Sequence, residues 1–180
     1  LELFVGRKDE LGRLKQKIDG ARSGKLQIAF LTGERGIGKT SLAAYMKAYA
    51  QNVNDMMGLH IMLGGVTSVE TVVYRILDTL LKDSVDRPWY EVVTEFLGKH
   101  VKKVGLFGVT VELSIAPDEL RNATHSFARA LITLVDKVAP DKKGLLLVLD
   151  DINGIAASAD FANWLKSLVD EIATMGIPAP

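Results

Sequence analysis

One segment restricts the possible folds of this chain more than any other. Residues 33–40 read Gly-Glu-Arg-Gly-Ile-Gly-Lys-Thr and match the pattern Gly-x4-Gly-Lys-[Ser/Thr]. An apolar run, residues 26–31, precedes the segment, and a helical pattern with Leu42, Ala43 and Met46 on one face follows it. A phosphate-binding loop requires this order of buried strand, glycine-rich loop and helix, so the chain is expected to contain a sheet that carries the strand.

The residue types of the loop give each position a physical task. Glycines let the backbone turn so that successive N–H groups, together with the positive end of the following helix, would hold a β-phosphate. Lys39 would reach the β- and γ-phosphates, which makes it a candidate catalytic residue, and Thr40 would present a hydroxyl to Mg²⁺. The alternative is a glycine-rich turn without a ligand. The candidate nucleotide-binding residues of this segment are Gly33, Glu34, Arg35, Gly36, Ile37, Gly38, Lys39, Thr40 and Ser41.

A second segment predicts a metal ligand. Residues 145–149 form an unbroken apolar run, typical of a strand that is covered on both faces, and Asp150 and Asp151 follow it directly. At the carboxyl end of a parallel sheet, Asp150 would lie beside the phosphate loop and hold Mg²⁺ through water. Asp151 is a candidate catalytic residue that would orient or deprotonate the attacking water. The alternative for Asp151 is an acidic residue at a helix N-terminus with no part in the chemistry.

Helical and strand patterns alternate along the rest of the chain. Apolar residues recur at helical spacing in several segments, whereas short apolar or alternating runs are typical of strands. The predicted helices cover residues 8–20, 39–51, 69–80, 90–104, 117–138 and 160–175, and the predicted strands cover residues 26–31, 60–63 or 60–66, 109–113 and 145–149. Ser68 is predicted to cap the helix that follows it. This alternation indicates a three-layer α/β/α fold around a mostly parallel sheet.

Composition excludes several classes of protein. With 180 residues and 48% hydrophobic residues, the chain is a globular domain rather than a disordered segment. Its 22 basic and 22 acidic residues balance, so the net charge does not indicate a nucleic-acid partner. The absence of cysteine excludes disulfides and thiolate chemistry, and His60, His100 and His125 lack metal-ligand spacing. No apolar run is long enough to span a membrane and no signal peptide is visible, so we expect a cytoplasmic protein.

Three segments together resemble one group of ATPases. Residues 4–11, Phe-Val-Gly-Arg-Lys-Asp-Glu-Leu, are similar to the opening box of AAA+-related and STAND ATPases. Residues 36–43 resemble their phosphate loop and first helical turn, and residues 145–151 resemble their Walker-B strand. The double Asp is closer to STAND ATPases, including the NB-ARC group, than to AAA+ proteins with Asp-Glu. The opening box also resembles archaeal ATPases and the initiator ATPases of the origin-recognition type.

The resemblance implies ATP and Mg²⁺ as cofactors. It also implies that Val5 and Gly6 lie beside adenine and that Arg7 contacts the base or its surroundings, so these three residues join the candidate nucleotide-binding set. Without the resemblance, the opening segment would be only a short apolar anchor before a helix.

The chain also departs from these families. Their phosphate-loop and Walker-B strands are normally separated by a strand that carries a polar sensor residue, and a helical lid follows it. Residues 176–180 stand where that strand would begin. We therefore expect residues 1–180 to be the N-terminal part of an ATP-binding domain, and further sequence or another segment to fill the gap between the two strands. Near residues 104–115 we expect a β-hairpin insertion, which either contacts a partner or forms only an edge element.

The favoured function is Mg·ATP binding with slow hydrolysis, as a conformational switch or motor module of a larger multidomain protein. The expected partners are ATP and ADP, downstream domains of the same polypeptide, and a second copy or another protein. One alternative is a nucleotide-binding scaffold without turnover, which the Asp at residue 151 and the missing sensor residues favour. A less favoured alternative is a P-loop small-molecule or nucleotide kinase, since phosphate loops occur there as well.

Overall fold

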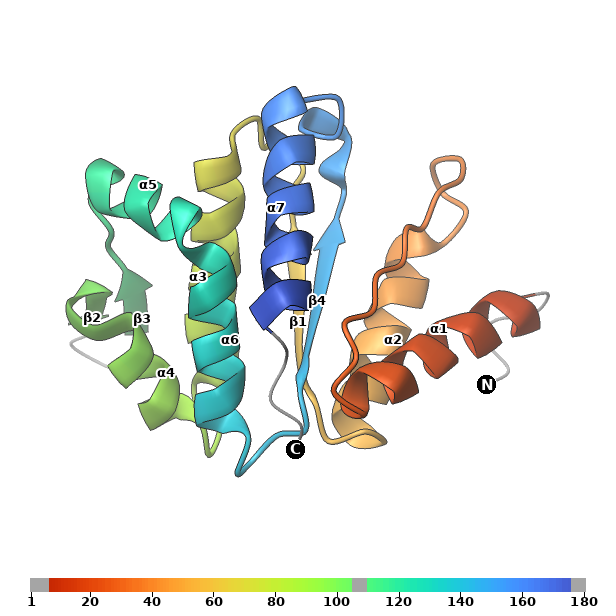
Figure 1. Ribbon diagram of the computed structural model, residues 1–180, viewed down its shortest axis with the longest axis horizontal. Helices are drawn as coiled ribbons and strands as arrows, with labels where there is room; N and C mark the ends of the chain where they lie inside the picture. The colour runs from red at the N-terminus through yellow and green to blue at the C-terminus, as the bar shows by residue number, and fades with distance from the viewer. Residues whose placement is uncertain (1–6, 105–109, 176–180) are drawn as a thin grey trace.

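The computed structural model describes residues 7–104 and 110–175 of the chain. Within them the elements follow in the order α1 (Lys8–Arg22), α2 (Lys39–Asn52), β1 (Met57–Met62), α3 (Val69–Ser84), α4 (Tyr90–Leu97), η1 (Gly98–His100), β2 (Val101–Val104), β3 (Thr110–Leu113), α5 (Pro117–His125), α6 (Phe127–Val138), β4 (Leu145–Asp150), η2 (Ile152–Gly154) and α7 (Ala159–Met175), where η denotes a short 3₁₀ turn. In Figure 1, β1 and β4 stand between α1 and α2 on the right and α3 and α6 on the left, with α7 in front.

The central feature is a parallel pair of strands, β1 and β4. Their register runs from Met57 opposite Leu145 to Met62 opposite Asp150. Parallel strands need a crossover connection, and the chain between these two strands supplies α3 to α6. With helices packed against a parallel sheet, the predicted α/β class is confirmed.

A second sheet is the antiparallel pair of β2 and β3, in which Val101 lies opposite Leu113. It packs beside α3, where the hydroxyl of Tyr74 donates a hydrogen bond of 3.0 Å to the carbonyl oxygen of Leu113. The alternating pattern that predicted a strand here is therefore confirmed for β3, while residues 105–109 lie outside the described part of the chain.

The larger core lies on the face of the parallel pair that α3 covers. Side chains alternate between the two faces of a strand, and Leu59 and Ile61 of β1 are buried here together with the Met57 side chain. The apolar residues of the helix predicted after Ser68 supply much of this core. The Ser68 hydroxyl caps α3 by accepting a hydrogen bond of 3.2 Å from the Thr71 N–H. The buried members on α3 are Val69, Val72, Val73, Ile76, Leu77, Leu80 and Leu81.

A smaller core fixes α1 and α2 to the opposite face of the sheet. Its buried residues are Leu11, Ile18, Leu42, Met46, Ala50 and Met56. Leu146 of β4 is partly buried against them. Because α2 begins at Lys39, this cluster determines where the glycine-rich loop lies relative to the end of β4.

The strand predicted over residues 26–31 does not form, and that prediction is wrong for this structure. These residues belong to neither sheet, and Figure 1 shows their segment running beside α2, apart from β4. Phe30 is 70% exposed, and Ile28 and Leu31 are 40% and 39% exposed. A strand needs a hydrogen-bonding partner, and within the described residues β4 pairs only with β1.

Three further predictions are corrected. The residues of β4 are half-buried rather than covered on both faces, since within the described residues one edge of β4 has no neighbouring strand. The helix predicted over residues 90–104 ends at Leu97, because Gly98 leaves the helical conformation at φ 55° and the chain continues into β2. The helix predicted over residues 117–138 is divided at Ser126, whose N–H and hydroxyl both donate to the Asn122 carbonyl.

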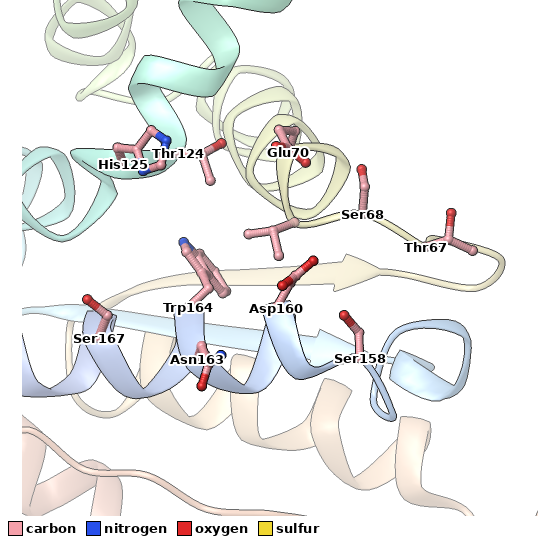
Figure 2. Close-up of a pocket in the computed structure, with 11 residues that line it drawn as sticks. Thr67, Ser68, Glu70, Thr124, His125, Ser158, Asp160, Asn163, Trp164 and Ser167 are labelled. Atoms are coloured by element: carbon pink, nitrogen blue, oxygen red, sulfur yellow. The ribbon is translucent and has the colours of Figure 1, made fainter.

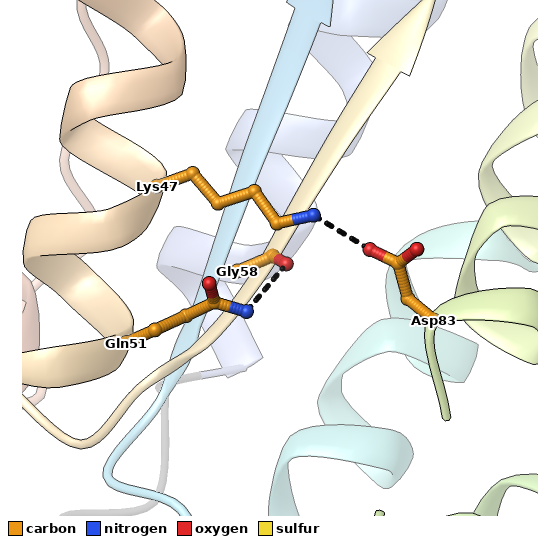
Figure 3. A network of polar contacts seen from close by, with 4 residues as sticks. All are labelled: Lys47, Gln51, Gly58 and Asp83. Carbon is orange, nitrogen blue, oxygen red and sulfur yellow. Dashed lines mark hydrogen bonds and ion pairs between the residues drawn. The ribbon is translucent and has the colours of Figure 1, made fainter. Parts of the chain in front are cut away.

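Side chains from two helices cover the outer edge of β1, as Figure 3 shows. Lys47 Nζ of α2 lies 2.7 Å from Asp83 Oδ2 at the end of α3, and Gln51 Nε2 donates a hydrogen bond of 3.3 Å to the Gly58 carbonyl. A Cβ added at Gly58 would lie 3.0 Å from Lys47 Cγ and 3.2 Å from Gln51 Cγ. Glycine at residue 58 therefore lets α2 approach β1 closely. The ion pair between Lys47 and Asp83 lies over the edge of β1 and hinders its pairing with another strand.

We expect Gly58→Ala to lower the free energy of unfolding by about 1–2 kcal/mol, the usual range for overpacking a well-packed contact. Urea unfolding at equilibrium measures this change. The control is Gly12→Ala in α1, where an added Cβ meets nothing within 4 Å and the loss of helical glycine should be neutral or stabilising. Equal stability of the two variants would contradict the proposed crowding at Gly58.

Candidate functional site

The glycine-rich loop reaches α2 through residues in the left-handed region. Gly36 and Gly38 have φ values of 84° and 86°, which side chains other than glycine rarely adopt. A Cβ added at either glycine would meet nothing within 4 Å, so backbone conformation rather than crowding requires glycine here. Gly38 is the N-cap of α2, and its carbonyl accepts the first helical hydrogen bond, from the Leu42 N–H at 3.0 Å. The positive end of α2 therefore opens onto the loop.

The ammonium group of Lys39 lies inside this loop. Its Nζ donates hydrogen bonds of 2.8 Å to the Gly33 carbonyl and 2.7 Å to the Glu34 carbonyl. The Lys39 side chain is half-buried, whereas the loop residues before Gly38 are exposed. The loop thus holds a positive charge at its centre while its backbone stays accessible to an anion.

Asp150, at the end of β4, is held by three donors. His60 Nε2 lies 2.9 Å from Asp150 Oδ2, and the Asp151 N–H donates a hydrogen bond of 2.8 Å to Asp150 Oδ1. The hydroxyl of Thr40 is the third donor. Burial raises the pKa of Asp150, but the hydrogen bonds from His60, Thr40 and the Asp151 N–H together lower the pKa below its ordinary value. The structure therefore brings Thr40 and an ionised Asp150 into contact, although α2 and β4 are far apart in sequence.

Arg7, just before α1, also reaches the loop. Its guanidinium group donates a hydrogen bond to the carbonyl of Ile37. The start of α1 is thereby tied to the loop that precedes α2. Val5 and Gly6, which the resemblance places beside adenine, lie outside the described residues.

Asp151 is oriented differently from Asp150. Its backbone is left-handed, with a φ of 55°, and its Oδ1 accepts a hydrogen bond of 2.8 Å from Asn153 Nδ2. A Cβ added at Gly64 would lie 2.7 Å from Asp151 Oδ2, so the carboxylate lies against the loop that follows β1. Among the described residues, no hydrogen bond or ion pair joins the Asp151 side chain to the glycine-rich loop.

His60 is the residue of this site that the sequence did not predict. It lies 90 positions from Asp150, and on sequence spacing it was an isolated histidine. The signal that could have found His60 is the register of the parallel pair. In this register Met62 lies opposite Asp150, and His60 comes two residues before Met62. Neither the pairing nor its register is visible in the spacing of sequence motifs.

A cavity of about 430 Å³ lies elsewhere, between the N-terminal ends of α3 and α7 and the junction of α5 with α6 (Figure 2). Ser68, Asp160 and Trp164 are among its lining residues. None of the residues predicted to bind nucleotide or metal lines it, so the candidate site and this cavity are separate.

The described residues contain no group of three or more His, Asp or Glu side chains placed to hold a metal ion. Thr40 and Asp150 supply two oxygen ligands at most. This donor set is compatible with Mg²⁺, which usually takes one or two protein oxygens and completes its shell with water and phosphate oxygens.

Three features of the site occur together in an α/β fold: a loop with glycines in the left-handed region, a lysine inside that loop, and an aspartate beside the threonine that follows the lysine. This combination defines a P-loop nucleotide-binding protein. A family model described as the AAA ATPase domain matches residues 3–177, and the chain belongs to this family. No curated protein and no solved structure matches the chain. Among the described helices, none combines the length and the apolar character that crossing a bilayer requires.

The lowered pKa of Asp150 predicts how its contribution to stability depends on pH. A carboxylate whose pKa is lower in the folded chain than its ordinary value of 3.8 stabilises the fold fully above that value. The contribution is lost as the pH falls through the folded-state pKa. We therefore expect the loss of unfolding free energy in Asp150→Asn to be largest above pH 3.8 and to shrink below it. Urea unfolding of both proteins across pH measures this difference, and a difference that grows with acid would contradict it.

Proposed function

We propose that this AAA ATPase domain binds Mg·ATP at residues 33–41 and hydrolyses it slowly, as a conformational switch or motor module of a larger protein. The observation that carries the proposal is the meeting of two chain segments at one end of the parallel pair. The loop that encloses the Lys39 ammonium, the hydroxyl of Thr40 and the ionised Asp150 come together there.

The residues fit a nucleotide triphosphate with its metal. The N–H groups of the loop and of the first turn of α2 would bind the β-phosphate, and Lys39 would exchange its bonds to loop carbonyls for bonds to phosphate oxygens. Thr40 and Asp150 would hold Mg²⁺, which when bound neutralises charge on the phosphate oxygens. Ser41, exposed in the first turn of α2, would face the phosphates from the same helix end.

The adenine base of the nucleotide is proposed to lie near the start of α1. The contact of Arg7 with the Ile37 carbonyl supports this placement, because it holds the residue before α1 against the loop. The Asp-Asp pair at residues 150–151 supports a relation to the STAND group within this family. Recognition of adenine by Val5 and Gly6 remains part of the same proposal.

The position of Asp151 supports slow turnover. Its carboxylate is held by Asn153 and lies against Gly64 rather than in hydrogen-bonding contact with the loop. To activate water at a γ-phosphate, this carboxylate would first have to turn from Gly64 toward the loop. The same observation favours, as a second candidate, a scaffold that binds nucleotide without turnover.

We also propose that residues 1–180 are the N-terminal part of the ATP-binding domain and that a further strand of the polypeptide pairs with β4. Within the described residues, β4 is bonded to β1 alone, and its side chains are only half-buried. The exposed Ile28, Phe30 and Leu31 would be covered if this strand also paired with residues 26–31. A strand added between the two segments would satisfy the backbone groups of both.

We expect Lys39→Ala to weaken ATP binding by at least about a hundredfold, because two charge-assisted hydrogen bonds of about 1.5 kcal/mol each would be lost. Titration with a fluorescent ATP analogue in the presence of Mg²⁺ measures the affinity. Lys25→Ala removes the same charge from an exposed residue before the loop and should leave the affinity unchanged. Retained affinity in Lys39→Ala would remove the loop from the proposed site.

We expect Asp151→Asn to keep ATP affinity and to slow phosphate release by about a hundredfold or more, the usual effect of losing a general base. Asp86→Asn is the matched control, since Asp86 is exposed and also has a positive φ, of 62°. Normal release by Asp151→Asn would exclude this residue from the mechanism. Bound nucleotide without release by the wild-type protein would favour the scaffold over the switch.

A further inference from the structure

We propose that His60 is a positioning residue that fixes the carboxylate of Asp150 for Mg²⁺. The inference rests on the proposed function, because it concerns the metal that accompanies the nucleotide. It assigns a role to a side chain that belongs to none of the motifs of the sequence.

The geometry of the parallel pair places His60 beside Asp150. His60 lies opposite Val148 in the register, and Met62, two residues on, lies opposite Asp150. Because side chains on one face of a strand recur every second residue, His60 and Asp150 project from the same face of the sheet. The His60 Nε2 atom lies 2.9 Å from Asp150 Oδ2, and the two side chains are 14% and 13% exposed.

The direction of the hydrogen bond follows from the chemistry of the acceptor. An ionised carboxylate can only accept hydrogen bonds, so the Nε2 atom of His60 carries the hydrogen whatever the state of the other ring nitrogen. The Asp151 N–H occupies Asp150 Oδ1 and His60 occupies Oδ2. With a donor on each oxygen, the carboxylate is fixed in orientation. Together with the Thr40 hydroxyl, these donors leave one of its roughly four lone-pair sites for a metal ion or its water.

A purely structural role explains this pair less well. The backbone ladder from Met57–Leu145 to Met62–Asp150 already sets the register of the two strands. The remaining strand positions near His60 are mostly apolar, and burying an imidazole with a carboxylate costs desolvation that an aliphatic pair would avoid. The hydroxyl of Thr40 meets the same carboxylate, so the interaction lies where the proposed metal ligands converge.

The test compares two substitutions in the full-length protein. His60→Leu removes the donor, whereas His60→Gln keeps an amide N–H of similar reach. Binding of a fluorescent ATP analogue is titrated against Mg²⁺, and also measured in EDTA. We expect His60→Leu to need at least about tenfold more Mg²⁺ for half-maximal binding, the usual effect of losing a partner of a metal ligand. Binding in EDTA should not change, and His60→Gln should recover most of the Mg²⁺ dependence.

Two controls separate positioning from a general effect. His100→Leu removes another imidazole–carboxylate contact, to Glu119 at 3.6 Å, and should leave the Mg²⁺ dependence unchanged. In an Asp150→Asn background, His60→Leu should have no further effect on Mg²⁺ dependence, because the carboxylate that it positions is gone.

Each outcome decides the proposal. An unchanged Mg²⁺ dependence in His60→Leu would overturn it while leaving the proposed function intact. Equal weakening of binding with Mg²⁺ and in EDTA, together with a lower melting temperature, would show a structural role and overturn it as well. Failure of the wild-type protein to bind ATP under either condition would overturn the proposed function, and the inference with it.

Discussion

The parallel pairing of β1 with β4 is the interaction on which the rest of the structure depends. Its register puts His60 beside Asp150, and its two faces supply the surfaces on which the helices pack. The α2 helix rests on one of these faces, which brings Thr40 to the end of β4. A shift of the register by one residue would turn the alternate side chains of β4 to the opposite face and separate the groups that meet there.

The two cores contribute unequally to this arrangement. The cluster around α3, α4, α6 and α7 is large, whereas the cluster that attaches α1 and α2 has few buried members. The helix that carries the loop is therefore held by less apolar contact than the helices on the other side. Two polar contacts add to the attachment of α1 and α2: the ion pair between Lys47 and Asp83, and the hydrogen bond from Arg7 to the Ile37 carbonyl. Elements attached by few buried contacts open more easily than the rest of a fold.

The sequence predicted what local chemistry determines and failed where pairing decides. The helix that follows the glycine-rich loop, α3 with its Ser68 cap and the strand that ends at Asp150 carry strong local signals, and each lies where expected. Residues 26–31 have the composition of a strand, but a strand forms only with a partner, and none lies beside them within the described chain. His60 escaped prediction for the same reason, since its role depends on the register of two strands that are distant in sequence.

The two carbonyls that hold Lys39 have a consequence for selectivity. An anion bound at the proposed site would gain from this lysine only the difference between the hydrogen bonds to its own oxygens and those to the Gly33 and Glu34 carbonyls that it displaces. A small anion with a single contact gains little from that exchange. A chain of phosphates offers several charged oxygens at once and also reaches the N–H groups of the loop. If the loop binds nucleotide as proposed, this exchange would favour polyphosphates over simple anions that make a single contact.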